Sequence, residues 1–328
     1  MKNKPFLLKP ACKDYLWGGT RLRDDFSKDC DITPFAEAWE CSTHPDGPSV
    51  VASGKNIGKT LTEVLKEHPE YIGTHPKDEA GGIPILAKFI DARSDLSVQV
   101  HPDDAYAYDK ENGQRGKTEM WYVVDAVPGA QLVYGFHRDI TKDKLRQCAE
   151  DGSIEKYLQR VDVKKNDVFY ITPGTVHAIG AGTLIAEIQE SSNLTYRLYD
   201  YNRTDKNGNK RELHLDKALD VANLKASDTP RQPMRVLKYK PGFASELLRR
   251  CKYFQVERLI INTERLREMF SFHTESNSFE VLMCIDGCGV MFFGTEQLPF
   301  FKGDTIFIPA DSIEIRIHGQ VQLLKINC

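Results

Sequence analysis

The apolar residues of this chain are gathered in short runs rich in strand formers, with turn residues between the runs. Clear examples are residues 120–124, 168–171 and 183–188. Short strands separated by frequent Gly, Pro, Asn and Asp are typical of β-sandwiches and jelly rolls. Helical patterns are few, and we expect them at 60–71, at 141–158 with a break at Gly152, and at 213–224. The chain is therefore predicted to be mostly β, with a few short helices.

One β-unit occurs twice along the sequence. Residues 118–125 resemble 279–286, and residues 165–173 resemble 302–309, in the same order. A Gly-Asp-strand-Pro pattern is common enough to recur by chance, but two matches in order favour an internal duplication. The polar, Pro-rich stretch at 225–235 has the composition of a linker.

This duplicated pattern resembles the cupin superfamily, whose first motif carries a His and a Glu before a Gly turn and whose second carries a Pro and a His. The resemblance implies two cupin-like jelly-roll barrels. We predict a metal-binding catalytic barrel with helical insertions at 1–230 and a C-terminal barrel at 231–328. In the C-terminal copy Glu314 stands near the place of the last His, so we expect no metal there. The alternative is a residual site at His273 and Glu280.

Charge, apolar runs and cysteine spacing indicate the cellular compartment and exclude some classes of partner. The formal charge of −3 argues against nucleic acid or an acidic membrane as the main partner, because both require a basic surface. No apolar run approaches the ~20 residues that span a bilayer, and the N-terminus lacks the pattern of a signal peptide. The 8 cysteines are scattered without a Cys-x-x-Cys pair, as expected of reduced thiols. We predict a cytoplasmic protein.

A polar pair interrupts an apolar strand. The segment 98–101, Val-Gln-Val-His, follows the strand-forming run 83–90 and is ended by Pro102. Alternate side chains of a strand share a face, so Gln99 and His101 point the same way, about 7 Å apart at the backbone. Both side chains can bind a metal ion, and the pair therefore predicts half of a metal site.

Glu119 and His177 are the candidates for the other half. Two imidazoles, one carboxylate and one amide oxygen suit Zn²⁺ or a similar divalent ion and leave positions open for water or substrate. Each residue also has an ordinary alternative. His101 could cap a strand end and His177 could fill a turn, while Glu119 could pair with Lys117. Taken together on the strand ends of one barrel, Gln99 and these three residues favour the metal site.

Arg197 lies in the polar segment 187–200, between apolar neighbours. An inward-facing Arg needs an anionic partner, since an unpaired buried charge is costly. A phosphate or an enediolate oxygen would serve. The alternative is a salt bridge to Glu187 or Glu190.

Several blocks of sequence follow one another along nearly the whole chain. They are Tyr-Leu-Trp-Gly-Gly at 15–19, Glu-Ala-Trp-Glu-Cys-Ser at 37–42, and the segments 96–104, 116–121, 173–178 and 196–200. As an ordered set they resemble the type I phosphomannose isomerases in their short bacterial form. Two positions depart from that family: Ala38 stands where a Gly is often found, and Asn193 where Asp is common. Neither is a proposed ligand.

The resemblance implies roles for particular residues. It implies one Zn²⁺ per chain, or another divalent metal, held by Gln99, His101, Glu119 and His177. It places Arg197 at the family's active-site arginine, Lys117 at a substrate-side lysine and Glu187 near an acidic residue of the pocket.

The implied reaction is the reversible conversion of mannose 6-phosphate to fructose 6-phosphate through a cis-enediol. The general base is left open among Glu187, Lys117 and a metal-bound hydroxide. Phosphate could be anchored by Lys117, Arg203, Lys210 or Arg211. The expected partner is a small sugar phosphate, and the protein is expected to be a monomer or a dimer.

Two other functions compete with the isomerase. A cupin oxygenase is one, since two His and a carboxylate also describe a non-haem iron site. The neutral ligand Gln99 and the nearby Lys117 and Arg197 count against it. The other is a sugar-phosphate-binding protein without turnover, against which the complete ligand set argues.

Overall fold

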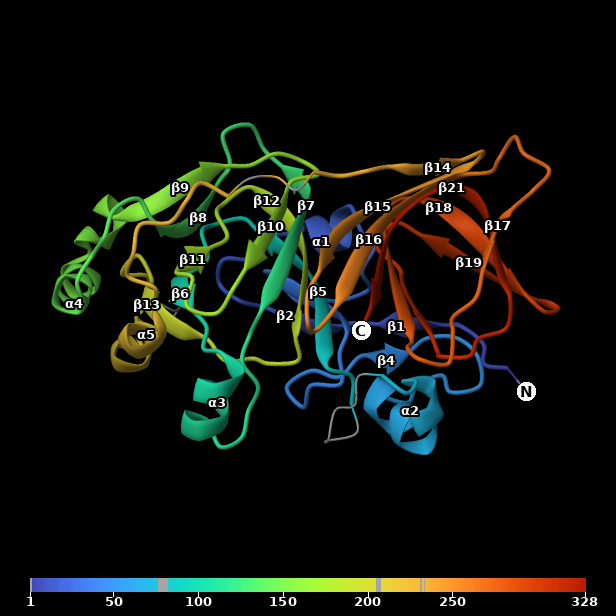
Figure 1. The fold of residues 1–328 in the computed structure, drawn as a ribbon, viewed down its shortest axis with the longest axis horizontal. Coiled ribbons are helices and arrows are strands. Elements are labelled where there is room, and N and C mark those ends of the chain that lie inside the picture. Colours follow the sequence, from blue (N-terminus) through green and yellow to red (C-terminus); the bar gives the residue numbers. More distant parts are fainter. Residues whose placement is uncertain (1, 76–81, 205–207, 231, 233) are drawn as a thin grey trace.

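The structure, a computed structural model, describes the chain except residues 1, 76–81, 205–207, 231 and 233. Strands dominate the described part, and the helices are short, with α2, α3, α4 and α5 at its edges in Figure 1. This confirms the expectation of a mostly β protein with few helices. Two residues of the expected linker, 231 and 233, lie outside the described residues.

Two sheets in the first part of the chain pack against each other. The first has the order β10 (Val168–Ile171), β7 (Glu119–Ala126), β12 (Thr183–Glu190), β5 (Ile85–Ala92), β3 (Glu37–Cys41), β2 (Ala11–Lys13). The second has the order β13 (Tyr196–Tyr199), β6 (Val98–Val100), β11 (His177–Ala178), β8 (Gln131–Phe136), β9 (Leu158–Asp162). Trp121 and Phe169 of the first sheet and Leu132 of the second belong to one buried apolar cluster. The two sheets therefore share a core.

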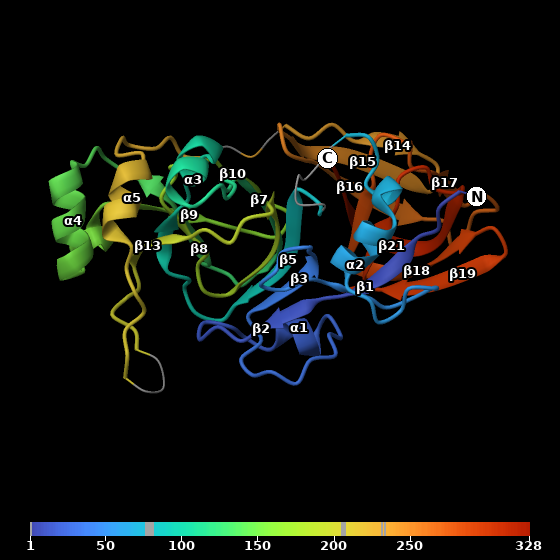
Figure 2. The same cartoon turned by 90° about the horizontal axis from the view of Figure 1, so that it is seen from below.

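A larger sheet unites the two ends of the chain. Its main path is β14 (Lys238–Lys240), β15 (Phe243–Arg250), β16 (Gln255–Asn262), β21 (Ile315–Asn327), β18 (Glu280–Phe293), β20 (Thr305–Ile308), β1 (Phe6–Lys9), β4 (Val50–Val51), with β17 (Phe270–Phe272) paired to β21 and β19 (Glu296–Phe301) paired to β18. Figure 2 shows β1 running among the C-terminal strands. The rings of Phe6 and Phe307 stack across this junction with centroids 5.3 Å apart. N-terminal residues thus complete the C-terminal sheet, while the division into two domains at residue 230 stays a prediction.

The two copies of the repeated unit form the same strand pair in the same register. Glu119 at the start of β7 lies opposite Ile171 of β10. Glu280 at the start of β18 lies opposite Ile308 of β20. Since an accidental sequence match would not reproduce a pairing register, this agreement supports the duplication.

Each of the three segments expected to be helical contains a helix in the structure. The 60–71 pattern forms α2 (Leu61–Glu67) with a capping box between Thr60 and Glu63, in which each side chain binds the other residue's backbone N–H. Gly152 ends α4 with a φ of 80°, as the expected break requires. The remaining helices are α1 (Arg21–Asp24), η1 (Pro69–Tyr71), α3 (Asp104–Lys110), α4 (Lys142–Asp151), η2 (Ser153–Lys156) and α5 (Leu215–Val221). Helices α1 and α3 were not predicted. For α3, Pro102 and the acidic pair after it were interpreted only as the end of a strand.

Two further expectations concern cysteines and membranes. All eight cysteines are free thiols in the structure. Among the described residues, the structure contains no helix with the length and apolar character of a membrane span.

Candidate active site

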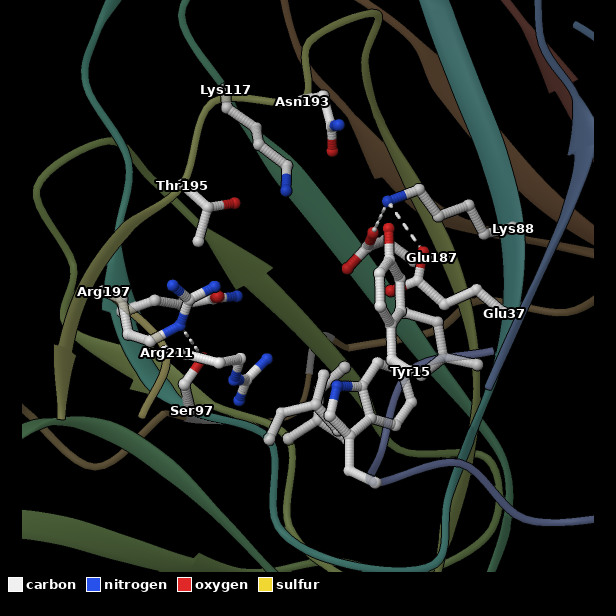
Figure 3. A pocket seen from close by; sticks show the side chains of 15 residues that line it. Tyr15, Glu37, Lys88, Ser97, Lys117, Glu187, Asn193, Thr195, Arg197 and Arg211 are labelled. Carbon is white, nitrogen blue, oxygen red and sulfur yellow. Dashed lines mark hydrogen bonds and ion pairs between the residues drawn. The ribbon is translucent and has the colours of Figure 1, made fainter. Parts of the chain in front are cut away.

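A cavity of about 260 Å³ opens between the first two sheets. It is lined by aromatic and apolar side chains and by an unusual number of charged ones: Glu37, Lys88, Lys117, Glu187, Arg197 and Arg211. Figure 3 shows the two arginines on one side of the cavity and the Glu37, Lys88 and Glu187 group on the other. The lining therefore offers positive charge at one side and a mixed acid–base group opposite.

Three of the predicted ligands meet at one buried point beside this cavity. His101 follows β6, Glu119 begins β7 and His177 begins β11, so each comes from a different strand end. Their ligand atoms all lie within 4.8 Å of one another, and all three residues are buried. His101 Nε2 is 3.2 Å from Glu119 Oε1, and His177 Nε2 is 3.7 Å from Glu119 Oε2. The fourth predicted ligand, Gln99, lines the cavity and places its amide nitrogen 3.4 Å from His177 Nε2.

The unmet hydrogen-bonding capacity of this cluster fits a cation. Glu119 Oε2 and both ring nitrogens of His101 are buried without a hydrogen-bond partner, while Glu119 Oε1 faces the Lys117 ammonium. His177 Nδ1 lies 2.8 Å from the Thr175 carbonyl, which can only accept, so Nδ1 carries the proton and Nε2 presents its lone pair. Buried polar groups are rarely left unpaired in native proteins, and a divalent ion would satisfy one nitrogen of each imidazole and the Glu119 carboxylate together.

The protonation states also suit a metal. Burial, and then the charge of Lys117, lower the pKa of His101 to about 3. Burial likewise lowers the pKa of His177. Burial alone would raise the pKa of Glu119, but the attraction of Lys117 and His101 outweighs it and holds that pKa well below its usual value. At neutral pH the cluster therefore has two neutral imidazoles and one carboxylate, which are the forms that bind metal.

Lys117 lies at the border between this cluster and the cavity. Its ammonium nitrogen is 2.9 Å from Glu119 Oε1, and its side chain is only 5% exposed although it lines the cavity. The expected pairing of Lys117 with Glu119 is therefore present, and it coexists with the metal-type cluster.

Glu187 belongs to a buried charge network that the sequence did not reveal. Its Oε1 is 3.1 Å from Lys88 Nζ, and its Oε2 accepts a hydrogen bond of 2.8 Å from Trp121 Nε1. Glu37 adds a second carboxylate 3.6 Å from Lys88 Nζ (Figure 3). Burial would lower the pKa of Lys88, but Glu37 and Glu187 outweigh it and raise that pKa, so the ammonium stays charged. A lysine inside the strand-forming run 83–90 was the signal that could have pointed to this network.

Arg197 stands opposite this network without an acidic partner. Its guanidinium donates to Ser97 Oγ at 3.3 Å and to the Glu212 carbonyl at 2.8 Å. Of the residues that the structure describes, no carboxylate lies within ion-pair distance of it. The alternative of a salt bridge to Glu187 or Glu190 is therefore wrong. Burial, and then the neighbouring charge of Arg211, lower the pKa of Arg197.

The other basic residues considered for phosphate differ in position. Arg211 lines the cavity while its guanidinium pairs with Asp200. Arg203 pairs with the same carboxylate at 2.5 Å but does not line the cavity. Lys210 is exposed and donates to Asn202. The structure thus brings Lys117 and Arg211 to the cavity and leaves the other two outside it.

The C-terminal copy has no comparable cluster. Glu280, the counterpart of Glu119, lies 3.4 Å from Lys325 Nζ. His273 is half-exposed and lies 3.3 Å from Glu275. Within the described residues the group of His101, Glu119 and His177 is the one that could hold a metal. The absence of metal from the C-terminal copy stays a prediction.

Glu190, the last residue of β12, leads to a prediction of how the free energy of unfolding depends on pH. Burial, with Asp104 nearby, raises its pKa to about 7, while its Oε1 accepts a hydrogen bond of 2.8 Å from Thr118 N. The stabilisation from the retained proton is fully present below the unfolded pKa, near 4.5, and is lost as the pH rises through 7. Glu190→Gln should remove this loss, which amounts to about 3 kcal/mol at most. Urea unfolding of the wild type and the variant at pH 5 and pH 8.5 measures the difference in unfolding free energy between the two pH values.

The control for this experiment is Glu150→Gln, at an exposed position of α4. Its unfolding free energy should follow the wild type at both pH values. Equal pH dependence of the wild type and the Glu190→Gln variant would show that Glu190 titrates normally.

Comparison with known proteins identifies relatives along the whole chain. A family model described as phosphomannose isomerase type I, catalytic domain, matches residues 6–151. A second, described as mannose-6-phosphate isomerase, cupin domain, matches residues 245–328. The mannose-6-phosphate isomerase ManA of Bacillus subtilis is 37% identical over 327 residues, which cover 99% of each chain.

Solved structures of mannose 6-phosphate isomerases have a similar fold. The crystal structure of mannose 6-phosphate isomerase from Bacillus subtilis is similar with a TM-score of 0.89 and 35% identity, covering 98% of this chain and 99% of that one. A mannose 6-phosphate isomerase described as bound with zinc and yttrium has a TM-score of 0.75 at 14% identity over 98% of each chain, and so shares the fold.

Proposed function

The chain belongs to the type I phosphomannose isomerase family, and on that premise we propose how its own residues interconvert mannose 6-phosphate and fructose 6-phosphate. The observation that carries the proposal is the buried cluster of two neutral imidazoles and one ionised carboxylate, placed beside a cavity that Arg197 and Arg211 also line. Such a cavity can hold a sugar between a metal and a phosphate-binding side.

We propose that His101, Glu119, His177 and the amide oxygen of Gln99 hold one Zn²⁺. The amide of Gln99 would turn its oxygen to the ion, since oxygen and nitrogen of an amide exchange by a flip. When bound, the ion supplies Lewis-acid polarisation of the sugar's carbonyl and hydroxyl oxygens. One Glu against a doubly charged ion leaves a net positive site that suits an enediolate.

Glu187 is the residue we assign to move the proton between C1 and C2. Its carboxylate lines the cavity, and burial together with repulsion from Glu119 raises its pKa, which brings a carboxylate closer to the pKa of an effective general base. Lys88 and Trp121 fix both of its oxygens. The orientation needed for proton transfer is therefore built into the structure before substrate arrives.

Lys117 and the arginines are assigned to substrate oxygens. Lys117 lies beside Glu119 and can donate hydrogen bonds to a sugar hydroxyl that is losing its proton. Arg197 and Arg211 are assigned to the 6-phosphate, because Arg197 is partly buried without a carboxylate and its guanidinium can bind two phosphate oxygens at once.

The direct test measures bound metal and turnover on the same preparation. Fructose 6-phosphate formation from mannose 6-phosphate should rise in proportion to the zinc content and stop when a chelator removes the metal. Absence of turnover by the metal-replete protein would contradict the assignment. Oxygen consumption by an iron-loaded sample, without isomerisation, would instead support the oxygenase alternative.

We further propose that the protein works in the cytoplasm on a soluble sugar phosphate, without nucleic acid or membrane as a partner. No acidic side chain of the described residues pairs with Arg197, and this, together with the polar lining of the cavity, supports a small anionic ligand.

A further inference from the structure

A turn of the C-terminal sheet contacts the segment that carries Lys117. Residues 251–254 join β15 to β16, and the turn is closed by a hydrogen bond of 3.0 Å from Cys251 N to the Phe254 carbonyl. Phe254 is 2% exposed and lies in the largest apolar cluster, which includes Phe89 of β5. The turn is thus anchored against the catalytic part of the chain.

Tyr253, next to that anchor, reaches the active-site segments through Asp104. Its hydroxyl donates a hydrogen bond of 2.7 Å to Asp104 Oδ2. The other oxygen of the same carboxylate accepts a hydrogen bond of 3.2 Å from Gly116 N. Asp104 therefore links the C-terminal turn to the residue directly before Lys117.

Asp104 also belongs to the segment that carries a metal ligand. It begins α3, three residues after His101. The two segments touch at a second point, where Lys117 N donates to the Pro102 carbonyl at 3.1 Å. A Cβ on Gly116 would come within 2.5 Å of the backbone of residues 103 and 104, so the segments are in direct backbone contact.

Further hydrogen bonds hold the Lys117 segment from within the catalytic part of the chain. Thr118 N donates to Glu190 at 2.8 Å, and Ser192 Oγ donates to the Arg115 carbonyl at 3.0 Å. From the C-terminal turn, Tyr253 and the exposed Lys252, whose Nζ lies 3.3 Å from the same Asp104 oxygen, reach this segment, and Tyr253 makes the shorter contact.

We propose that Tyr253 is a positioning residue for the isomerase reaction, acting through Asp104 and Gly116 to hold the Lys117 segment against the His101 segment. The inference rests on the role proposed above for Lys117. It assigns the C-terminal sheet a part in catalysis without placing any of its side chains on the substrate. Small displacements of a catalytic group are costly, since an error of about 1 Å can lower a rate by up to about 100-fold.

The test is Tyr253→Phe, which removes one hydroxyl and keeps the ring. With mannose 6-phosphate and zinc-loaded enzyme, we expect kcat to fall by roughly three- to tenfold, with KM, zinc content and melting temperature close to the wild type. Tyr239→Phe, at an exposed position of β14, is the matched control and should leave kcat unchanged.

A double-mutant cycle separates positioning from a general loss of stability. In a Lys117→Met background, Tyr253→Phe should cause no further loss of kcat, because the group that it positions is gone. An unchanged kcat for Tyr253→Phe alone, or a full additional loss in the Lys117→Met background, would overturn the inference. Full activity of Lys117→Met alone would contradict the proposed role of Lys117 itself. A wrong role for Lys117 and a wrong role for Tyr253 would therefore show in different variants.

Discussion

Replacing Glu119 with Gln should abolish turnover of mannose 6-phosphate. Glu119 is the anionic member of the ligand cluster, and its carboxylate is fully buried beside both histidines. A neutral amide keeps the shape but loses the charge that balances a divalent ion. We expect zinc to be lost on dialysis and kcat/KM to fall at least about 1,000-fold, which corresponds to about 4 kcal/mol of transition-state stabilisation.

The measurement pairs metal analysis with steady-state kinetics on the same dialysed samples. Glu150→Gln, on the exposed face of α4, is the control and should keep both zinc and activity. Far-UV circular dichroism of the Glu119→Gln variant should match the wild type. A variant that keeps stoichiometric zinc and full activity would show that Glu119 is not a ligand.

Arg197→Ala should lower kcat/KM for mannose 6-phosphate by about 100-fold while leaving the zinc content unchanged. The guanidinium lines the cavity and is held by Ser97 and the Glu212 carbonyl, neither of which carries a negative charge. If it binds the 6-phosphate, its removal loses a charge-assisted hydrogen bond worth about 3 kcal/mol. The metal cluster makes no contact that depends on Arg197, so metal binding should survive.

Mannose without the phosphate distinguishes the two roles open to Arg197. If Arg197 binds the 6-phosphate, Arg197→Ala should hardly affect any turnover of mannose. If Arg197 stabilises the enediolate, the losses should be equal for both sugars. Lys210→Ala, at an exposed position outside the cavity, is the control and should behave as wild type. Loss of zinc from Arg197→Ala would mean that the residue is structural.

Local sequence signals predicted the secondary structure where local energies decide it. The capping pair of Thr60 and Glu63 and the left-handed Gly152 act within one turn of chain, and both helix boundaries follow from them. Helix α3 was missed although Asp103 caps it by accepting a hydrogen bond from Tyr106 N. The same Asp residues also suit a turn, and their sequence alone does not separate the two outcomes.

The candidate site was only partly predictable. Metal-ligand types have few other buried roles, so Gln99, His101, Glu119 and His177 could be singled out from their residue types and positions. Lys88 and Glu37 escaped notice because a lysine or a glutamate in a strand is usually solvated, and nothing nearby in sequence shows that these two meet Glu187. Their pairing depends on β3, β5 and β12 lying side by side.

The sequence by itself determined the mostly β class, the repeated unit and the identities of the proposed ligands, because these depend on residue type and on spacing within a few residues. Only the tertiary structure decided which charges face one another. Burial and proximity across strands made both histidines neutral and paired Glu187 with Lys88, while no acid of the described residues pairs with Arg197. Tertiary pairing also joined β1 to β20 and brought Tyr253 to Asp104. Such contacts join residues separated by up to about 300 positions, and their energies arise only once the sheets have packed.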